Sequence, residues 1–278
     1  MVETKFAQKL GKSFVVNVEA VPPAGRDCAQ MAAKIAAALN DQPIDAINLA
    51  DSPMASPRMS PSLFAGALRA AVPAELEIIP HVTVRDRNCV ALQGLLWGIA
   101  GLGISTILAV SGDPVQYSSD PRARHVGHLS VSELVGMARE AGLRVGVVLD
   151  PRPALREREL RKLEKKISAG AQFVITQPLY AIHELEVLAA DLASLGAPAL
   201  LGILPLVSVR HARFLDEKVP GISVPASLLS QMERAGEDAL AIGIANARQM
   251  LAGAREWMAG ACLMPPFGRF NLVSAVLG

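Results

Sequence analysis

The chain has 278 residues, of which 51% are hydrophobic and only 4% aromatic, so its core must be built mainly from Ala, Val, Leu and Ile. Its 27 basic and 26 acidic residues give a formal net charge of +1, which provides no positive field for a nucleic-acid backbone or an anionic membrane surface. The three cysteines Cys28, Cys89 and Cys262 lie far apart and lack the spacing of a disulfide framework or a structural zinc site.

Short apolar runs alternate with helical segments along the chain. The predicted strands are Phe14–Ala20, Ala46–Ala50, Glu77–Val84, Thr106–Gly112, Arg144–Asp150, Phe173–Pro178, Ala199–Leu206 and Gly260–Pro265. The predicted helices are Asp27–Leu39, Pro61–Ala71, Cys89–Gly101, Ser132–Ala141, Ala154–Ser168, Ile182–Leu195, Arg210–Glu217 and Pro225–Ala254.

Right-handed connections between such strands allow either a closed barrel or an open, doubly wound sheet. Eight repeats without a two-halved pattern favour closure. No Gly-x-Gly-x-x-Gly follows the first strand, as it usually does in an open dinucleotide-binding sheet. We therefore expect a single-domain α/β protein, a (β/α)8 TIM barrel over residues 1–278.

The segment Met1 to Lys12 is charged and lacks the apolar stretch of a secretion signal. No run reaches the roughly 18 uninterrupted apolar residues of a membrane span. We expect a soluble protein of the reducing cytoplasm.

In a barrel of parallel strands the carboxyl ends meet at one rim, where the chemistry of this architecture collects. Polar residues at or just past the predicted strand ends are Glu19, Asp51, Thr83, Asp113, Asp150 and Gln177. The sequence therefore predicts a polar site at this mouth.

Glu19 ends an apolar run and stands shortly before Pro22-Pro23. Desolvation by such neighbours favours the neutral carboxyl, which can act as a general acid near pH 7. From the sequence alone, Glu19 could equally well be a carboxylate that accepts hydrogen bonds from backbone amides in a loop.

Two further mouth residues suit a flat heterocycle. Asp113 follows Gly112, which lets the backbone approach a planar ligand, although Gly-Asp-Pro is also an ordinary turn. The amide of Gln177 offers donors and an acceptor to an aminopyrimidinone edge, or it ties two loops together.

His81 and Thr83 alternate inward on the third strand and precede Arg85-Asp86-Arg87-Asn88, a cluster able to contact a ribityl or phosphate group. A hydrogen-bonded core histidine is the alternative for His81. The Lys165-Lys166 pair could neutralise phosphates or form a solvated helix face. No histidine spacing suits a catalytic metal, and no Gly-x-Ser-x-Gly elbow is present.

Five segments in register resemble the methylenetetrahydrofolate reductase family of flavin-dependent barrels. They are Val-Glu-Ala-Val-Pro-Pro at 18–23, His-Val-Thr at 81–83, Leu-Ala-Val-Ser-Gly-Asp-Pro at 108–114, Ala-Gly-Ala-Gln-Phe-Val-Ile-Thr-Gln at 169–177 and Gly-Ile-Leu-Pro at 202–205. Other segments, such as 81–88, 163–167 and 208–215, are similar to the branch often fused to a homocysteine methyltransferase module, which implies a place in methionine biosynthesis.

This resemblance implies reduction of 5,10-methylenetetrahydrofolate to 5-methyltetrahydrofolate, with FAD as cofactor and NADH or NADPH as reductant. Glu19 would be the acid that helps open the five-membered ring, Asp113 would contact the pterin and tune the flavin, and Gln177 would bind the pterin. The expected flavin contacts are His81, Thr83, Ser111, Gly112, Asp113, Asp150 and Lys166. The resemblance also implies a homo-oligomer.

The chain departs from the family at some of these positions. Ser111 stands where well-studied members carry an arginine, and Val209 where they carry a folate-stacking phenylalanine. Two alternatives therefore stay open: a flavin-free methyltransferase that works with a corrinoid protein, and a folate-binding subunit without turnover.

Overall fold

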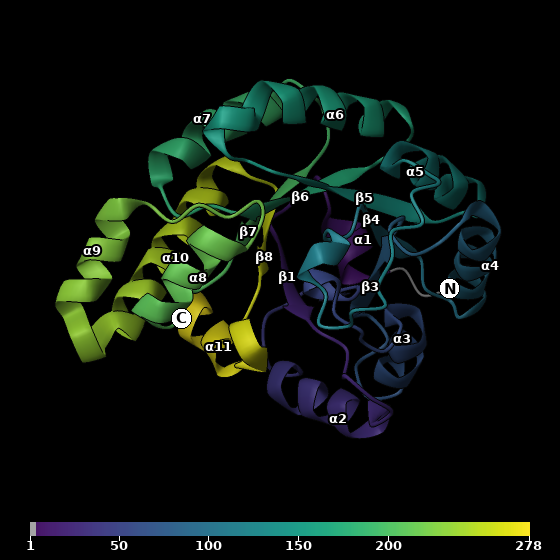
Figure 1. Ribbon diagram of the computed structural model, residues 1–278, viewed down its shortest axis with the longest axis horizontal. Helices are drawn as coiled ribbons and strands as arrows, with labels where there is room; N and C mark the ends of the chain where they lie inside the picture. Colours follow the sequence, from purple (N-terminus) through teal and green to yellow (C-terminus); the bar gives the residue numbers. More distant parts are fainter. Residues whose placement is uncertain (1–3) are drawn as a thin grey trace.

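The computed structural model describes residues 4–278, in which eight parallel strands pair in sequence order and the last pairs with the first to close a barrel (Figure 1). The strands are β1 (Val15–Ala20), β2 (Ala46–Leu49), β3 (Glu77–Thr83), β4 (Thr106–Val110), β5 (Arg144–Leu149), β6 (Phe173–Pro178), β7 (Ala199–Ile203) and β8 (Gly260–Leu263). The predicted TIM barrel is confirmed.

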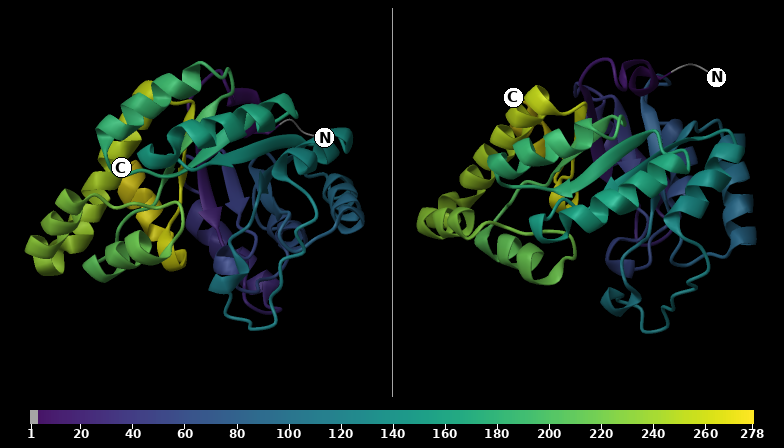
Figure 2. Two further views of the ribbon diagram at one scale, coloured as in Figure 1. Left: turned by 45° about the horizontal axis from the view of Figure 1, so that its top comes forward. Right: turned by 90° about the horizontal axis from the view of Figure 1, so that it is seen from above.

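Helices cover the outside of the strand ring. They are α2 (Cys28–Leu39), α3 (Pro61–Arg69), α4 (Cys89–Gly101), α5 (Val131–Glu140), α6 (Arg156–Ser168), α7 (Ile182–Ala193), α8 (Val209–Lys218), α9 (Ala226–Ala235), α10 (Ala239–Trp257) and α11 (Asn271–Leu277). Both views of Figure 2 place α9 and α4 at opposite ends of the molecule. No helix among the described residues is long and apolar enough to cross a membrane.

Strand side chains alternate between two apolar clusters, as the period of two requires. Val16 and Val18 of β1 belong to the large core between the sheet and the helices, whereas Val15 belongs to the barrel interior. Because both faces are buried, each strand appears in the sequence as a short, nearly continuous apolar run. A third cluster, around Tyr180, Leu206 and Met232, joins α8, α9 and α10.

The short helix α1 (Lys5–Lys9) closes the base of the barrel. Its Phe6 is fully buried and meets Phe173 of β6 edge to face, with ring centroids 5.4 Å apart. Gly146 of β5 makes this contact possible, because a Cβ there would lie 2.2 Å from the Phe173 ring. The lower end of the barrel interior is thus filled by Phe6 of α1.

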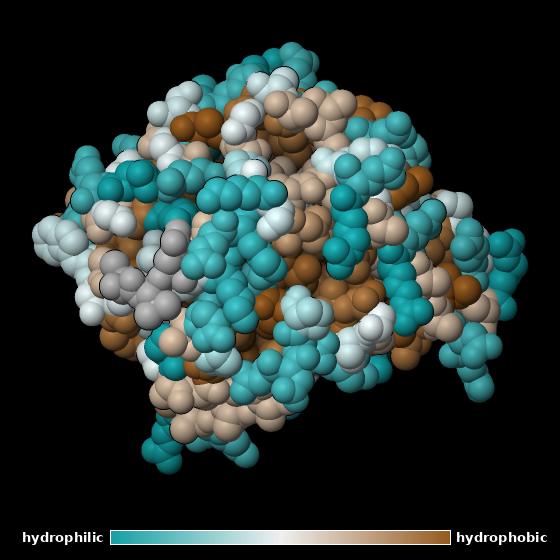
Figure 3. All heavy atoms as spheres, turned by 180° about the vertical axis from the view of Figure 1, so that it is seen from behind, coloured by the Kyte–Doolittle hydropathy of each residue, from teal (hydrophilic) through white to brown (hydrophobic). Residues whose placement is uncertain are grey.

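Figure 3 shows the molecule from behind, with the base of the barrel toward the viewer and polar side chains around exposed apolar atoms. A hollow of about 470 Å³ lies there, between the segment after α1 and the ends of α7 and α10. Phe14, Pro198 and Met258 are among its lining residues. None of the residues predicted for the site lines this hollow.

Some predicted boundaries were wrong for identifiable reasons. β4 ends at Val110 because Gly112 turns the chain with a φ of +79°, and β7 ends at Ile203 because Pro205 has no N–H for the ladder. The predicted helix Pro225–Ala254 is two helices, α9 and α10, because Gly236 has a φ of +56° between them. Helices α1 and α11 were not predicted.

Candidate functional site

Solvent reaches the upper part of the barrel interior, at the carboxyl ends of the strands. Inward-facing residues deep in the barrel, such as Asn17 and Leu108, are buried, whereas those near the strand ends are only half-buried. The half-buried set is Glu19, His81, Val110, Val148, Gln177 and Met264. These side chains at the mouth are therefore partly accessible from solvent.

Glu19, near the end of β1, has the properties of a proton donor. Burial, and to a lesser degree the nearby Asp113 carboxylate, raise the pKa of Glu19 to about 7. Its carboxyl group has no hydrogen bond to another described residue. The raised pKa agrees with the prediction from the apolar strand, and the alternative of a loop-bound carboxylate is wrong.

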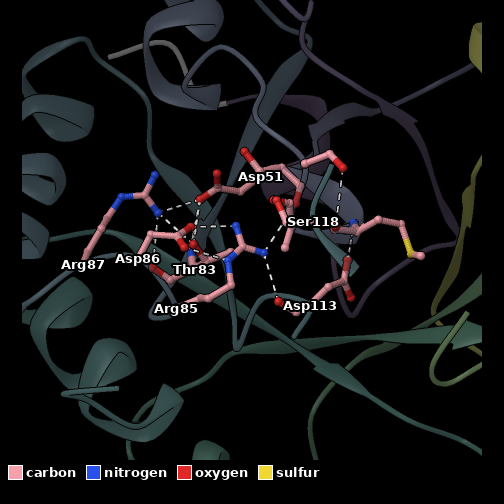
Figure 4. A network of polar contacts seen from close by, with 11 residues as sticks. Asp51, Thr83, Arg85, Asp86, Arg87, Asp113 and Ser118 are labelled. Atoms are coloured by element: carbon pink, nitrogen blue, oxygen red, sulfur yellow. Dashed lines mark hydrogen bonds and ion pairs between the residues drawn. The ribbon is translucent and has the colours of Figure 1, made fainter. Parts of the chain in front are cut away.

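Asp113, three residues after β4, is partly engaged by the protein itself. Its Oδ2 accepts a hydrogen bond from the Met54 amide at 2.6 Å, and its carbonyl oxygen accepts one from Arg85 Nη1 at 3.2 Å (Figure 4). Its Oδ1 has no partner among the described residues. One carboxylate oxygen thus holds a loop, and the other is free to contact a ligand.

The loop that Asp113 holds is strained. Ser52, Met54 and Ala55 all have φ values between 50° and 54°, a region that L-residues rarely adopt. The Ser118 hydroxyl, next to the short helix η2 (Val115–Tyr117), donates to the Ala55 carbonyl at 2.7 Å. Contacts from beyond β4 therefore keep this loop in place beside the mouth.

Thr83, at the end of β3, lies beneath the rim in a polar network (Figure 4). Its backbone amide and hydroxyl both donate to Asp51 Oδ2, at 3.2 and 3.1 Å. Arg87 Nη1 donates to the same Asp51 oxygen at 2.7 Å and to the Thr83 hydroxyl at 2.8 Å. With only 1% of its surface exposed, Thr83 supports the rim and does not line it.

Arg85, expected to face a ribityl or phosphate group, is only 2% exposed. Its guanidinium makes paired hydrogen bonds to Asp86, at 2.8 and 2.6 Å. Gly112 packs against this region: a Cβ there would lie 3.0 Å from Arg85 Cβ and 3.1 Å from Thr83 Cγ2. The expectation of a cationic cluster facing the ligand is therefore wrong for Arg85, because aspartates neutralise both Arg85 and Arg87.

His81, on β3, is a neutral imidazole at the mouth. Burial lowers its pKa to about 4, and the negative charge of Asp51 only partly opposes this effect. Its Nε2 lies 3.3 Å from Asn48 Nδ2, and its Nδ1 has no partner among the described residues. One ring nitrogen, Nε2, is thus used inside the barrel, and the other, Nδ1, is available to a ligand.

Gln177 and Asp150 lie together at the ends of β6 and β5. Both lie close to Gly221: a Cβ added at this position would be 3.3 Å from Gln177 Cγ and 3.7 Å from Asp150 Oδ2. Asp150 is paired with Arg152 at 2.7 Å, whereas the Gln177 amide has no hydrogen bond to another described residue. Gln177 is thus the free amide of the mouth.

Lys166, on α6, reaches the end of β5 from outside the barrel. Its ammonium donates to the Val148 carbonyl at 2.8 Å, and burial lowers its pKa. It makes no ion pair with a described carboxylate. Ser111 is exposed just past β4, and Val209 packs into the cluster of α8, α9 and α10.

Sequence reasoning missed several residues that shape the site. Asn17 and Asn48 face the barrel interior, and counting back by two from Glu19 along β1 would have found Asn17. Met54, Arg152 and Gly221 approach the mouth from loops, and no local pattern marks them.

The comparison with family models decides which family this barrel represents. The model for methylenetetrahydrofolate reductase matches residues 5–256. The chain belongs to this family. No curated protein matched it.

Solved structures show the same fold at low sequence identity. An uncharacterized protein from Clostridium thermocellum, described as binding two copies of 5-methyl-5,6,7,8-tetrahydrofolic acid, is 16% identical with a TM-score of 0.70, over 98% of this chain and 95% of that one. A 2,3-dimethylmalate lyase is 13% identical with a TM-score of 0.58, over 100% and 84%. An oxaloacetate acetylhydrolase is 10% identical with a TM-score of 0.52, over 95% and 79%. At these identities the likeness concerns the fold alone.

Proposed function

We propose that this methylenetetrahydrofolate reductase family member binds a reduced folate at its barrel mouth and reduces 5,10-methylenetetrahydrofolate to 5-methyltetrahydrofolate. Family membership supports a folate ligand. The Clostridium thermocellum protein of the same fold, which binds 5-methyltetrahydrofolic acid, supports the same ligand class. The observation that carries the proposal is Glu19, a half-buried carboxyl without a hydrogen-bond partner among residues 4–278, whose pKa is raised to about 7.

Such a carboxyl suits the first step of the reaction. The methylene carbon is bonded to two folate nitrogens, and one of these C–N bonds must break before the carbon can be reduced. Glu19 donates its proton to the departing nitrogen, which keeps the bonding electron pair, and the remaining nitrogen forms an iminium with the methylene carbon. The negative charge of Asp113 helps to keep Glu19 protonated, so the acid form is present near pH 7.

Gln177 and Asp113 orient the pterin in this proposal. The free amide of Gln177 can donate to and accept from the aminopyrimidinone edge, and Asp113 Oδ1 can accept from its N–H groups. Because neither group needs to break a hydrogen bond to a described residue first, both contacts are available when the ligand arrives.

Of the residues that the family resemblance assigns to FAD, four fit the chemistry of that group, whereas Thr83 is buried beneath the rim. His81, Gly112 and Asp150 belong to the neighbouring ends of β3, β4 and β5, and Lys166 reaches the same arc from α6. His81 Nδ1 is available to a flavin ring acceptor, and the unpaired Lys166 ammonium to a phosphate. Bound FAD would supply the hydride, after its own reduction by NADH or NADPH.

Visible absorbance of the purified protein tests this function. We expect flavin bands that bleach on anaerobic addition of NADH or NADPH and return with 5,10-methylenetetrahydrofolate. A protein that retains its flavin but neither binds nor turns over any folate would contradict the proposal.

A second candidate is flavin-free transfer of a methyl group between tetrahydrofolate and a corrinoid protein. The observation that favours it is the charge of the rim: Arg85, Arg87 and Arg152 are each paired with an aspartate, and Ser111 is uncharged. Lys166 has no carboxylate partner among the described residues and would be left to contact a dinucleotide's phosphates. A colourless protein that binds 5-methyltetrahydrofolate and demethylates it in the presence of a corrinoid protein would favour this candidate, whereas binding without any turnover would indicate a folate-binding subunit.

A further inference from the structure

Two buried asparagines connect the barrel interior to His81. Asn17 of β1 donates from Nδ2 to Asn48 Oδ1 of β2 at 3.0 Å, and Asn48 Nδ2 lies 3.3 Å from His81 Nε2 of β3. Both asparagines are fully buried. The three side chains therefore form one hydrogen-bonded row across adjacent strands, directly below the mouth.

The direction of this row determines where the imidazole proton lies. Asn48 Oδ1 is already used as the acceptor for Asn17, so the group that Asn48 turns toward His81 is its NH2. An amide NH2 only donates, so His81 Nε2 must be the acceptor. In a neutral imidazole the single proton is then on Nδ1.

Stability alone does not account for the two amides. Their register neighbours on adjacent strands include the apolar Ala46, Ile79 and Cys262, and Asn48 also pairs with Glu19 of β1. Asn17 Oδ1 is buried without a partner in the described part of the chain, which is unfavourable for folding, and an aliphatic residue would avoid this loss. What the row does provide is a fixed tautomer of His81, the member of the row that reaches the mouth.

We propose that Asn17 and Asn48 are positioning residues that hold His81 as the Nδ1–H tautomer, so that a ligand at the mouth meets a hydrogen-bond donor on β3. The matching ligand atom is an acceptor of a planar heterocycle, a carbonyl oxygen or an unprotonated ring nitrogen. Pterins and flavins both carry such atoms. This second part rests on the proposed function, whereas the tautomer itself does not.

Nitrogen-15 NMR of ring-labelled histidine in the ligand-free protein tests the tautomer directly. The His81 signals are assigned by their loss in His81→Gln, and the spectra are recorded at pH 7, where the ring is neutral. We expect Nδ1 at the position of a protonated nitrogen and Nε2 at that of an unprotonated one. The reverse pattern would overturn the inference without any variant of the asparagines.

Asn48→Leu tests whether the row is the cause. We expect both His81 nitrogens to shift to intermediate positions, because removal of the amide leaves neither tautomer favoured. Asn246→Leu is the matched control, since Asn246 of α10 donates to the Tyr180 carbonyl at 2.9 Å and does not belong to the row. Unchanged His81 signals in a folded Asn48→Leu protein would overturn the positioning role; if that variant does not fold, Asn17→Ala, which removes only the first link, is measured against the same expectation.

Titration with 5-methyltetrahydrofolate and, separately, with FAD identifies the acceptor. The ligand that His81 contacts should move the Nδ1–H signal, and Asn48→Leu should weaken its binding about 5-fold, the effect of one hydrogen bond. A ligand that binds by equilibrium dialysis without moving the signal is not the acceptor, and two such ligands would overturn the donor role. Absence of all binding would instead contradict the proposed function and leave the tautomer result in force.

Discussion

The two parts of the barrel rim use their polar side chains differently. On the β2 to β4 side, Asp51, Thr83 and Arg87 bond to one another, and Asp113 holds the loop before α3. At the ends of β1 and β6, Glu19 and Gln177 have no hydrogen bond to another described residue. The first part is a fixed wall, and the second presents groups that are free to bind. Substitutions in the two parts should therefore affect different properties.

Glu19→Gln should have the largest effect, a fall in turnover of about 100-fold or more, because glutamine keeps the shape of the side chain but is not an acid. Folate binding, measured by equilibrium dialysis, should change little. Turnover at the wild-type rate would exclude Glu19 from the mechanism. It would also contradict the proposed distinction between the two parts of the rim.

The wild-type rate should also depend on Glu19 through pH. Because the acid form is needed and its pKa is about 7, single-turnover rates should be constant at lower pH and fall about tenfold per unit well above pH 7. The descending limb should be absent from the residual rate of Glu19→Gln. A descending limb in both proteins would assign it to another group.

The same pKa has a consequence for folding. A carboxyl whose pKa rises from 4.5 to about 7 on folding contributes stability that is full below pH 4.5 and is lost as the pH rises through 7. At pH 8, Glu19→Gln should therefore be more stable than the wild type, by about 3 kcal/mol at most. Equal urea midpoints at pH 8 would show that Glu19 is not desolvated in the folded protein.

Asp51→Ala should destabilise the fixed wall by about 3 kcal/mol, because it leaves Arg87 and the Thr83 amide without their buried partner. The matched control is Asp120→Ala, which breaks the exposed Arg122 pair and should cost less than about 1 kcal/mol. Urea unfolding measures both. Equal losses would mean that the β2 to β4 network is no stronger than a surface ion pair.

Gly112→Ala should cost about 2 kcal/mol, since it combines a positive φ with close contact to Thr83 and Arg85. Gly103→Ala is the control: Gly103 has a φ of +75° but open space around its Cβ, so strain alone should cost about 1 kcal/mol. The difference between the two unfolding free energies measures how tightly the wall is packed. No difference would contradict the close packing.

Gln177→Leu should have the smallest effect, a loss of about 5-fold in affinity for 5-methyltetrahydrofolate, the value of one hydrogen bond. Stability should be unchanged, because the amide has no hydrogen bond to any residue that the structure describes. Gln231→Leu, on the exposed face of α9, should leave binding as it is. A variant that binds as well as the wild type would place the pterin elsewhere.

Much of this molecule could be predicted from its sequence because strand and helix patterns are local. The alternation of apolar runs predicted the closed barrel, and the apolar residues before Glu19 predicted its raised pKa. The partners of Asp51 and Arg85 could not be predicted, since they depend on how adjacent strand ends and their loops meet in space. Helix α1 was missed because five residues are too few to show a periodic pattern.

The aromatic contact between Phe6 and Phe173 determines how molecules can move through the barrel. Because these rings seal its lower end, whatever enters at the top must also leave there. Two reactants that are too large to bind at the mouth together would have to bind one after the other. The first would then have to be released before the second could bind.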